Sequence, residues 1–134
     1  MTQTLTQTRT SNERDTDVRA RLDELFQYVR EGRILDAMTE FYAPDAAMQE
    51  NANPPTVGRE ANIEREKQFL SNVKQWVGFE VKAAAAEGDT SFYESVIEFV
   101  AQNDQQVRLE QVSVARWRDG QIVHERFYYD SGAK

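Results

Sequence analysis

The feature that most constrains this chain is a change in the spacing of its apolar residues after Gln75. Before that residue they recur with the spacing of a helix face, and after it they alternate with polar residues, as in half-buried strands. Short breaks containing Gly, Asn or Asp divide the second part, as expected between antiparallel strands. The sequence therefore predicts four long strands in a meander, over residues 76–87, 91–102, 107–118 and 121–130.

The part before Gln75 predicts helices. An apolar stripe from Val18 to Val29 marks a first helix, with Thr16 as a candidate N-cap and Gly32 as a candidate C-terminal stop. A second, shorter stripe over residues 34–42 marks another helix, and we expect Pro44 to end it, because proline and the residue before it disfavour helical geometry.

A short strand and a third helix follow. Residues 45–50 are predicted to form the strand, residues 51–56 have the composition of a turn, and residues 58–74 return to helical spacing. On this third helix the charged side chains are expected to face solvent: Glu60, Glu64, Arg65, Glu66 and Lys67.

Length and composition favour one domain. The chain has 134 residues, which suits a single hydrophobic core, so residues 17–134 are expected to form one domain behind a mobile, polar tail of residues 1–16. A net charge of −7 without a dense basic run argues against nucleic-acid binding. No apolar stretch is long enough for a membrane span, no cysteine is present, and there is one histidine. We expect a cytoplasmic protein that has no metal site of cysteines or several histidines and does not bind membranes.

The predicted order is helix, helix, strand, helix and four strands, an α+β fold. With FYAPDA after the second helix, PPTVGRE opening the third and RWRDGQIVHERFYYD closing the chain, it resembles the nuclear transport factor 2-like superfamily. Within that superfamily the similarity points to SnoaL-like cyclases, limonene-epoxide hydrolases and ketosteroid isomerases. The resemblance implies a cone-shaped curved antiparallel sheet, mixed at its first strand, packed against three helices as a cystatin-like α+β barrel with an apolar pocket.

The last two strands can be sorted by face. A three-residue loop, Arg118-Asp119-Gly120, would pair Trp117 with Gln121 and Ser113 with Glu125. The family comparison places this face inside the cone. The opposite face would carry His124 and an apolar strip, and since many members of the superfamily dimerise there, we expect a homodimer through this strip: Val112, Val114, Ile122 and Tyr128.

Glu50 is the first candidate catalytic residue. In the ungapped comparison from Phe41 it falls on the position of the aspartate base of ketosteroid isomerases. A carboxylate at the mouth of an apolar cavity would be desolvated, which would raise its pKa toward neutrality and suit it to proton transfer. The alternative is a strand-end glutamate that faces water or pairs with Arg59.

Two further carboxylates are candidates. Glu94 would share the cavity with Glu50 if its strand face is the pocket wall, and the alternative is a pair with a basic residue on a neighbouring strand. Asp130 resembles the acid/base aspartate near the end of the last strand in SnoaL-like cyclases, but the register puts it on the outer face unless a bulge turns it inward. The same register places His124 outside the cone.

Neither relative's catalytic set is complete. At the positions where the resemblance places the epoxide hydrolases' Arg, two Asp and Tyr, this chain has Glu94, Val96, Phe127 and Met48. Where isomerases carry an oxyanion-binding tyrosine and aspartic acid, the nearest residues are Leu25 or Phe26, and Ser113.

The sequence leaves three hypotheses open: a cofactor-free isomerase, cyclase or hydratase for a small apolar carbonyl-bearing metabolite, a non-catalytic ligand-binding module, or a dimeric interaction protein whose cavity is filled. The residues expected to contact the ligand are Phe26, Tyr42, Met48, Trp76, Val96, Gln111, Ser113, Phe127 and Tyr129.

Overall fold

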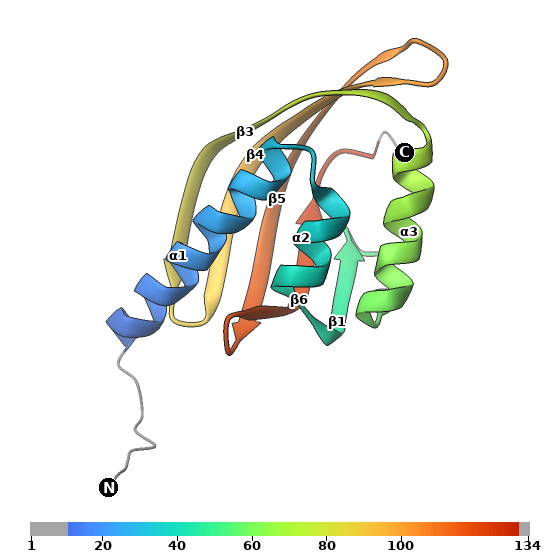
Figure 1. The fold of residues 1–134 in the computed structure, drawn as a ribbon. Helices are drawn as coiled ribbons and strands as arrows, with labels where there is room; N and C mark the ends of the chain where they lie inside the picture. The colour runs from blue at the N-terminus through green and yellow to red at the C-terminus, as the bar shows by residue number, and fades with distance from the viewer. Residues whose placement is uncertain (1–10, 132–134) are drawn as a thin grey trace, which may run out of the picture.

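The computed structural model describes residues 11–131, with three helices and a six-stranded mixed sheet. In chain order the elements are α1 (Ser11–Arg30), α2 (Ile34–Phe41), β1 (Tyr42–Glu50), β2 (Thr56–Val57), α3 (Arg59–Ser71), β3 (Val73–Glu87), β4 (Thr90–Ala101), β5 (Gln106–Arg118) and β6 (Gln121–Tyr128). Figure 1 shows the helices covering one face of a strongly curved sheet. The α+β prediction is confirmed, but the sheet does not close into a barrel.

The helix α1 begins earlier than predicted. It starts at Ser11, so Thr16 lies within the helix and is not its N-cap. The predicted stripe is correct, since Val18, Leu22 and Leu25 are buried. The helix ends as expected, because Gly32 has a φ of 76° and the Arg33 amide donates to the Tyr28 carbonyl at 2.9 Å. The tail was predicted over residues 1–16. Residues 1–10 lie outside the described part of the chain, and residues 11–16 belong to α1.

The short helix α2 ends at Phe41, three residues before Pro44, and β1 follows it directly. β1 is therefore longer than predicted, and it pairs in parallel with β6, which makes the sheet mixed. β2, where only a turn was predicted, adds two antiparallel residues at the edge. The sheet order is β2-β1-β6-β5-β4-β3, and the predicted meander of the last four strands is confirmed.

Irregularities in the ladder bend the sheet. β3 is 15 residues long, and its pairing with β4 shifts at three places, between Val73 and Gln75, Trp76 and Gly78, and Val81 and Ala83. Each extra residue increases local twist and bends the strand. The curvature creates a concave face against which the helices pack, and the core cluster around Leu22, Phe26 and Phe41 lies between these layers.

The β5–β6 hairpin differs from the predicted register. Arg118 pairs with Gln121, so the turn has two residues, Asp119 and Gly120, whose φ angles of 53° and 80° suit such a turn. The register then shifts after Trp117, which pairs with Ile122, and beyond the shift Ala115 pairs with Glu125. The turn was thus predicted incorrectly, and Ile122, expected on the outer strip, is fully buried.

Candidate functional site

A cavity of about 380 Å³ lies between the concave face of the sheet and the three helices. All three helices and the strands β1, β3, β4, β5 and β6 contribute to its wall. Most of its lining is apolar or aromatic, from Leu25, Val29, Ile34, Ala37, Met38, Met48, Phe69, Trp76, Phe79, Ile97, Leu109 and Phe127. Because it has this volume, the hypothesis of a filled cavity does not describe this molecule.

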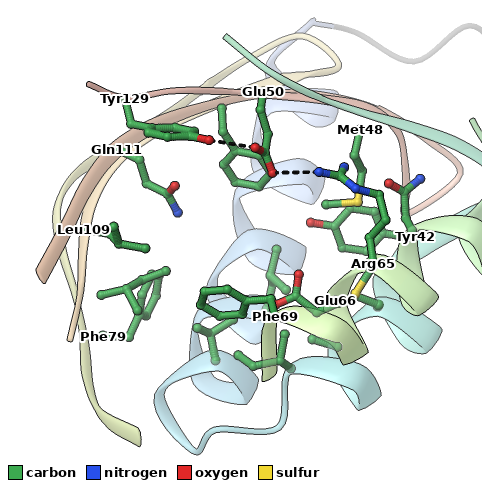
Figure 2. A pocket seen from close by; sticks show the side chains of 18 of the residues that line it. Tyr42, Met48, Glu50, Arg65, Glu66, Phe69, Phe79, Leu109, Gln111 and Tyr129 are labelled. Atoms are coloured by element: carbon green, nitrogen blue, oxygen red, sulfur yellow. Dashed lines mark hydrogen bonds and ion pairs between the residues drawn. The ribbon is translucent and has the colours of Figure 1, made fainter. Parts of the chain in front are cut away.

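Glu50 ends β1 at the rim of the cavity, where it is held by two donors. The Tyr129 hydroxyl donates to its Oε1 at 2.6 Å, and Arg65 on α3 lies 3.3 Å from its Oε2, as Figure 2 shows. Its side chain is 39% exposed. The hydrogen bond to Glu50 is the main cause that raises the pKa of Tyr129 to about 12. The expected alternative pair with Arg59 is not formed, because Arg59 donates instead to the Tyr42 carbonyl at 3.1 Å.

A second carboxyl group, that of Glu66 on α3, also lines the cavity. Figure 2 shows it extending from the helix toward the cavity interior. The pKa of Glu66 is raised from 4.5 to about 7, chiefly by burial and next by the charge of Glu50. The prediction that Glu66 faces solvent is wrong. The residue shares a helix face with buried Asn62, four positions earlier, and with Phe69, three positions later, both of which line the cavity.

A third carboxyl group is fully buried behind the cavity wall. Glu125 on β6 accepts hydrogen bonds from Ser113 at 2.5 Å and from the hydroxyl of Tyr42, and it also bonds to Tyr93. Burial raises the pKa of Glu125, while these hydroxyl groups act in the opposite direction. The two tyrosines line the cavity and Glu125 does not, so the network fixes the orientation of both rings from behind.

Six of the predicted ligand contacts line the cavity: Tyr42, Met48, Trp76, Gln111, Phe127 and Tyr129. The other three do not. Phe26 is buried in the core, with its ring centroid 4.9 Å from that of Tyr93, and Ser113 lies behind the wall, bonded to Glu125. Val96 is buried on the opposite face of β4 from Tyr93 and Ile97, which line the cavity, because successive residues of a strand point to opposite faces.

The other two predicted catalytic residues are not brought to Glu50. Glu94 is exposed on the outer face, opposite Val112 on β5, so it forms no carboxylate pair in the cavity. Asp130 follows β6, is exposed and does not line the cavity. His124 is half-buried opposite Arg116 and also lies away from the cavity.

Two residues of the site were not singled out from the sequence. Glu125 belongs to the set of residues on the last two strands that was predicted to face inward. It is the one acidic residue of that set, and this is the signal that could have marked it. Glu66 was recognisable from its spacing to Asn62 and Phe69, a face that the stripe of aliphatic residues on α3 does not follow. Within residues 11–131 no group of three or more His, Asp or Glu could hold a metal ion, and no helix is long and apolar enough to cross a membrane.

The family is decided by a match over most of the chain. The family model described as a SnoaL-like domain matches residues 17–125. The chain belongs to the SnoaL-like family. This match confirms the expected relationship to nuclear transport factor 2-like proteins and extends from within α1 to within β6. No curated protein sequence matches the chain.

Solved structures of this fold are similar along nearly the whole SnoaL-like chain. A protein of Jannaschia sp. CCS1, provisionally assigned as a SnoaL-like polyketide cyclase, is 19% identical, with a TM-score of 0.76 over 92% of this chain and 91% of its own. A provisionally assigned isomerase of Bacillus subtilis is 19% identical, with a TM-score of 0.72 and coverages of 91% and 90%. An LEH-like epoxide hydrolase of M. tuberculosis is 16% identical, with a TM-score of 0.70 and coverages of 87% and 84%. These TM-scores establish the shared fold, which hosts several activities.

Proposed function

We propose that this SnoaL-like protein is a cofactor-independent acid/base enzyme of the isomerase or cyclase class, acting on a small, largely apolar molecule that carries a carbonyl group. The observation that carries the proposal is the carboxylate of Glu50, held by Tyr129 and Arg65 at the edge of an apolar cavity. A base fixed by two hydrogen bonds is positioned to take a proton from one defined place on a bound molecule.

The cavity supports the choice of ligand. Its volume of about 380 Å³ lies in the range of small-molecule sites, and its mainly apolar wall favours an apolar body. Polar groups are few and face the cavity from different elements, among them Gln111 on β5. The Gln111 side-chain amide has no hydrogen bond within residues 11–131, so its N–H groups are available to a carbonyl oxygen. A carbonyl group in turn makes the neighbouring C–H acidic enough for a carboxylate base.

The experiment is proton–deuterium exchange at the carbon next to the carbonyl in cyclohexanone, decalone and tetralone, followed by NMR in heavy water. We expect exchange above the buffer rate with at least one ketone, and a loss of roughly 100-fold or more in Glu50→Gln. Glu60→Gln is the matched control, because Glu60 is an exposed residue of α3 outside the cavity, beside Arg59. Ketone binding without exchange would contradict the enzyme and support a non-catalytic binding module of the same fold.

We also propose a homodimer through the outer face of the sheet. Three apolar side chains are exposed there on adjacent strands, Phe92 on β4, Val112 on β5 and Tyr128 on β6, and we call them the outer strip. Val112 pairs directly with Tyr128, and it lies opposite Glu94, two residues from Phe92. Exposed apolar side chains gathered on one face are typical of contact surfaces.

A further inference from the structure

We propose that Glu66 is the general acid of this cavity and that it works with Glu50 as the base. The inference rests on the proposed function and deepens it, because it assigns the second proton of the reaction and narrows the substrate to an enolisable carbonyl compound. The two carboxyl groups come from different elements, β1 and α3, and face the same cavity (Figure 2).

The contacts of Glu50 suit a base. Both of its oxygens accept, one from the Tyr129 hydroxyl at 2.6 Å and the other from the Arg65 guanidinium at 3.3 Å. A carboxyl group that only accepts is in its ionised form. In this arrangement Glu50 has no proton to give, and it can receive one.

The contacts of Glu66 differ from those of Glu50. Its carboxyl group has no hydrogen bond and no ion pair within residues 11–131, although basic residues flank it in the sequence. Arg65 is engaged by Glu50 and by the Thr56 hydroxyl, and Lys67 pairs with Glu64 at 3.2 Å. A half-buried carboxyl group without a partner is best accommodated in its neutral form, whose O–H is then free to donate into the cavity.

The charges around Glu66 act in the same direction. Glu50 on β1 and Glu125 on β6 both raise its pKa, burial raises it most, and only Arg65 on its own helix lowers it, which leaves a pKa of about 7. Tyr42 on β1 also lies near enough to interact with it electrostatically. Near neutral pH the group is therefore present in both protonation states, as an efficient general acid requires.

The chemistry balances without a cofactor. In enolisation, the C–H bond next to the carbonyl breaks and its proton goes to Glu50. The electron pair of that bond forms the carbon–carbon double bond, and the π bond of the carbonyl group breaks with its electron pair moving to the oxygen. The oxygen uses this pair to take the proton of Glu66, whose O–H bond breaks and leaves a carboxylate. Return to the carbonyl form reverses both transfers, so each carboxyl group ends in the state in which it began.

The test is the pH dependence of deuterium exchange into tetralone by the whole protein and its variants. In the wild type we expect kcat to fall as pH rises through about 7, where Glu66 loses its proton. In Glu66→Gln we expect kcat to drop at least about tenfold at pH 6 and the fall to disappear, with KM changed much less. Glu64→Gln is the matched control: Glu64 lies two residues away, exposed and paired with Lys67, and this variant should behave like the wild type.

A second variant separates chemistry from structure. Glu66→Asp keeps a carboxyl group, so we expect kcat to be lower than in the wild type but still to fall as pH rises. Circular dichroism checks that each variant is folded. A wild-type profile and rate in Glu66→Gln, with exchange lost in Glu50→Gln, would overturn the role of Glu66 and leave the proposed function standing. No exchange by the wild type with any of the three ketones would remove the proposed function, and this inference with it.

Discussion

Glu125 illustrates at the scale of one residue how a buried acid is tolerated in this core. Its side chain is inaccessible to solvent, yet hydroxyl groups of Ser113, Tyr42 and Tyr93 surround it. Burying an unsatisfied carboxyl group costs several kcal/mol, whereas a satisfied one costs far less. Burial and the nearby Glu125 carboxyl raise the pKa of Tyr42 and Tyr93 in turn, so the tyrosines remain donors.

Removing one donor from this network has a measurable cost. Tyr42→Phe leaves Glu125 without one of its hydrogen bonds in a site that water does not reach, so we expect the free energy of unfolding to fall by about 1–3 kcal/mol. Tyr28→Phe is the control, because the Tyr28 hydroxyl forms no hydrogen bond within residues 11–131 while its ring packs on Phe41 at 5.1 Å. Urea denaturation of both variants measures the difference. Equal losses would show that the network does not stabilise the fold.

Glu66 predicts a pH dependence of stability. Its pKa is about 7 in the folded protein and near 4.5 when unperturbed, so the folded state keeps a proton that the unfolded chain releases. The stability associated with this proton is complete below about pH 4.5 and is lost as pH rises to about 7.

Glu66→Gln has no such proton to lose. We therefore expect it to be as stable as the wild type near pH 4 and more stable by about 3 kcal/mol at pH 8, since each pKa unit corresponds to 1.36 kcal/mol. Urea titrations at several pH values test this, with Glu64→Gln as the control. If the difference in free energy of unfolding between Glu66→Gln and the wild type were the same at pH 4 and at pH 8, it would be inconsistent with the raised pKa.

At the scale of elements, the β5–β6 hairpin shows what alternation can and cannot predict. Two errors cancelled there. The turn has two residues where three were expected, which reverses the faces, and a bulge after Ile122 reverses them again. Ser113, Glu125 and Phe127 therefore face inward as predicted, while Ile122 does not lie where it was expected. A bulge leaves no local mark in the sequence, because the curvature of the whole sheet sets its position.

The prediction of which face of α3 is exposed failed for a different reason. The aliphatic residues of α3 suggested a buried face and its charged residues a solvent-exposed face, but the face that meets the cavity carries Asn62, Glu66 and Phe69. A cavity wall need not be apolar, since cavity-facing groups are not packed against other side chains. The hydrophobic pattern of a helix therefore reports its packed face and misses residues that face a hollow.

Gly32 connects the end of α1 to the cavity wall. It has a φ of 76°, and an added Cβ would lie 3.3 Å from Cδ1 of Trp76, whose side chain lines the cavity. Gly32→Ala is expected to lower the free energy of unfolding by roughly 1–2 kcal/mol through backbone strain and this close contact. Gly88→Ala separates the two causes, because Gly88 has a φ of 59° and nothing within 4 Å of such a Cβ. A loss in Gly32→Ala that is no larger than the loss in Gly88→Ala, measured by thermal unfolding, would exclude the contact.

For the whole molecule, the sequence predicted the element order except for β2, the meander and the parallel first strand, because these depend on periodicity and on the family resemblance. It also predicted Glu50 and six of the nine ligand contacts at the cavity. It did not predict which carboxyl group accompanies Glu50. Glu94 was chosen from its strand and Glu66 was missed, since that partnership depends on how α3 lies across the sheet, a property of the tertiary packing alone.

The proposed homodimer is a prediction at the same scale. Analytical ultracentrifugation should give twice the mass of one chain, and Val112→Lys, in the middle of the outer strip, should give monomers because it places a charge in an apolar contact. Val57→Lys is the control, because Val57 is 69% exposed on β2, away from the strip. A wild type that sediments as a monomer at every concentration would contradict the proposal.

The central claim is that the cavity holds a carboxyl group that exchanges its proton near neutral pH, and an NMR titration of glutamate side-chain carboxyl carbons tests it most directly. The signal of Glu66 is assigned by its absence from the spectrum of Glu66→Gln. We predict that its midpoint lies near pH 7 in the wild type and moves down in Glu50→Gln, where one neighbouring negative charge is removed. A midpoint near 4.5 that does not respond to the loss of Glu50 would contradict the account.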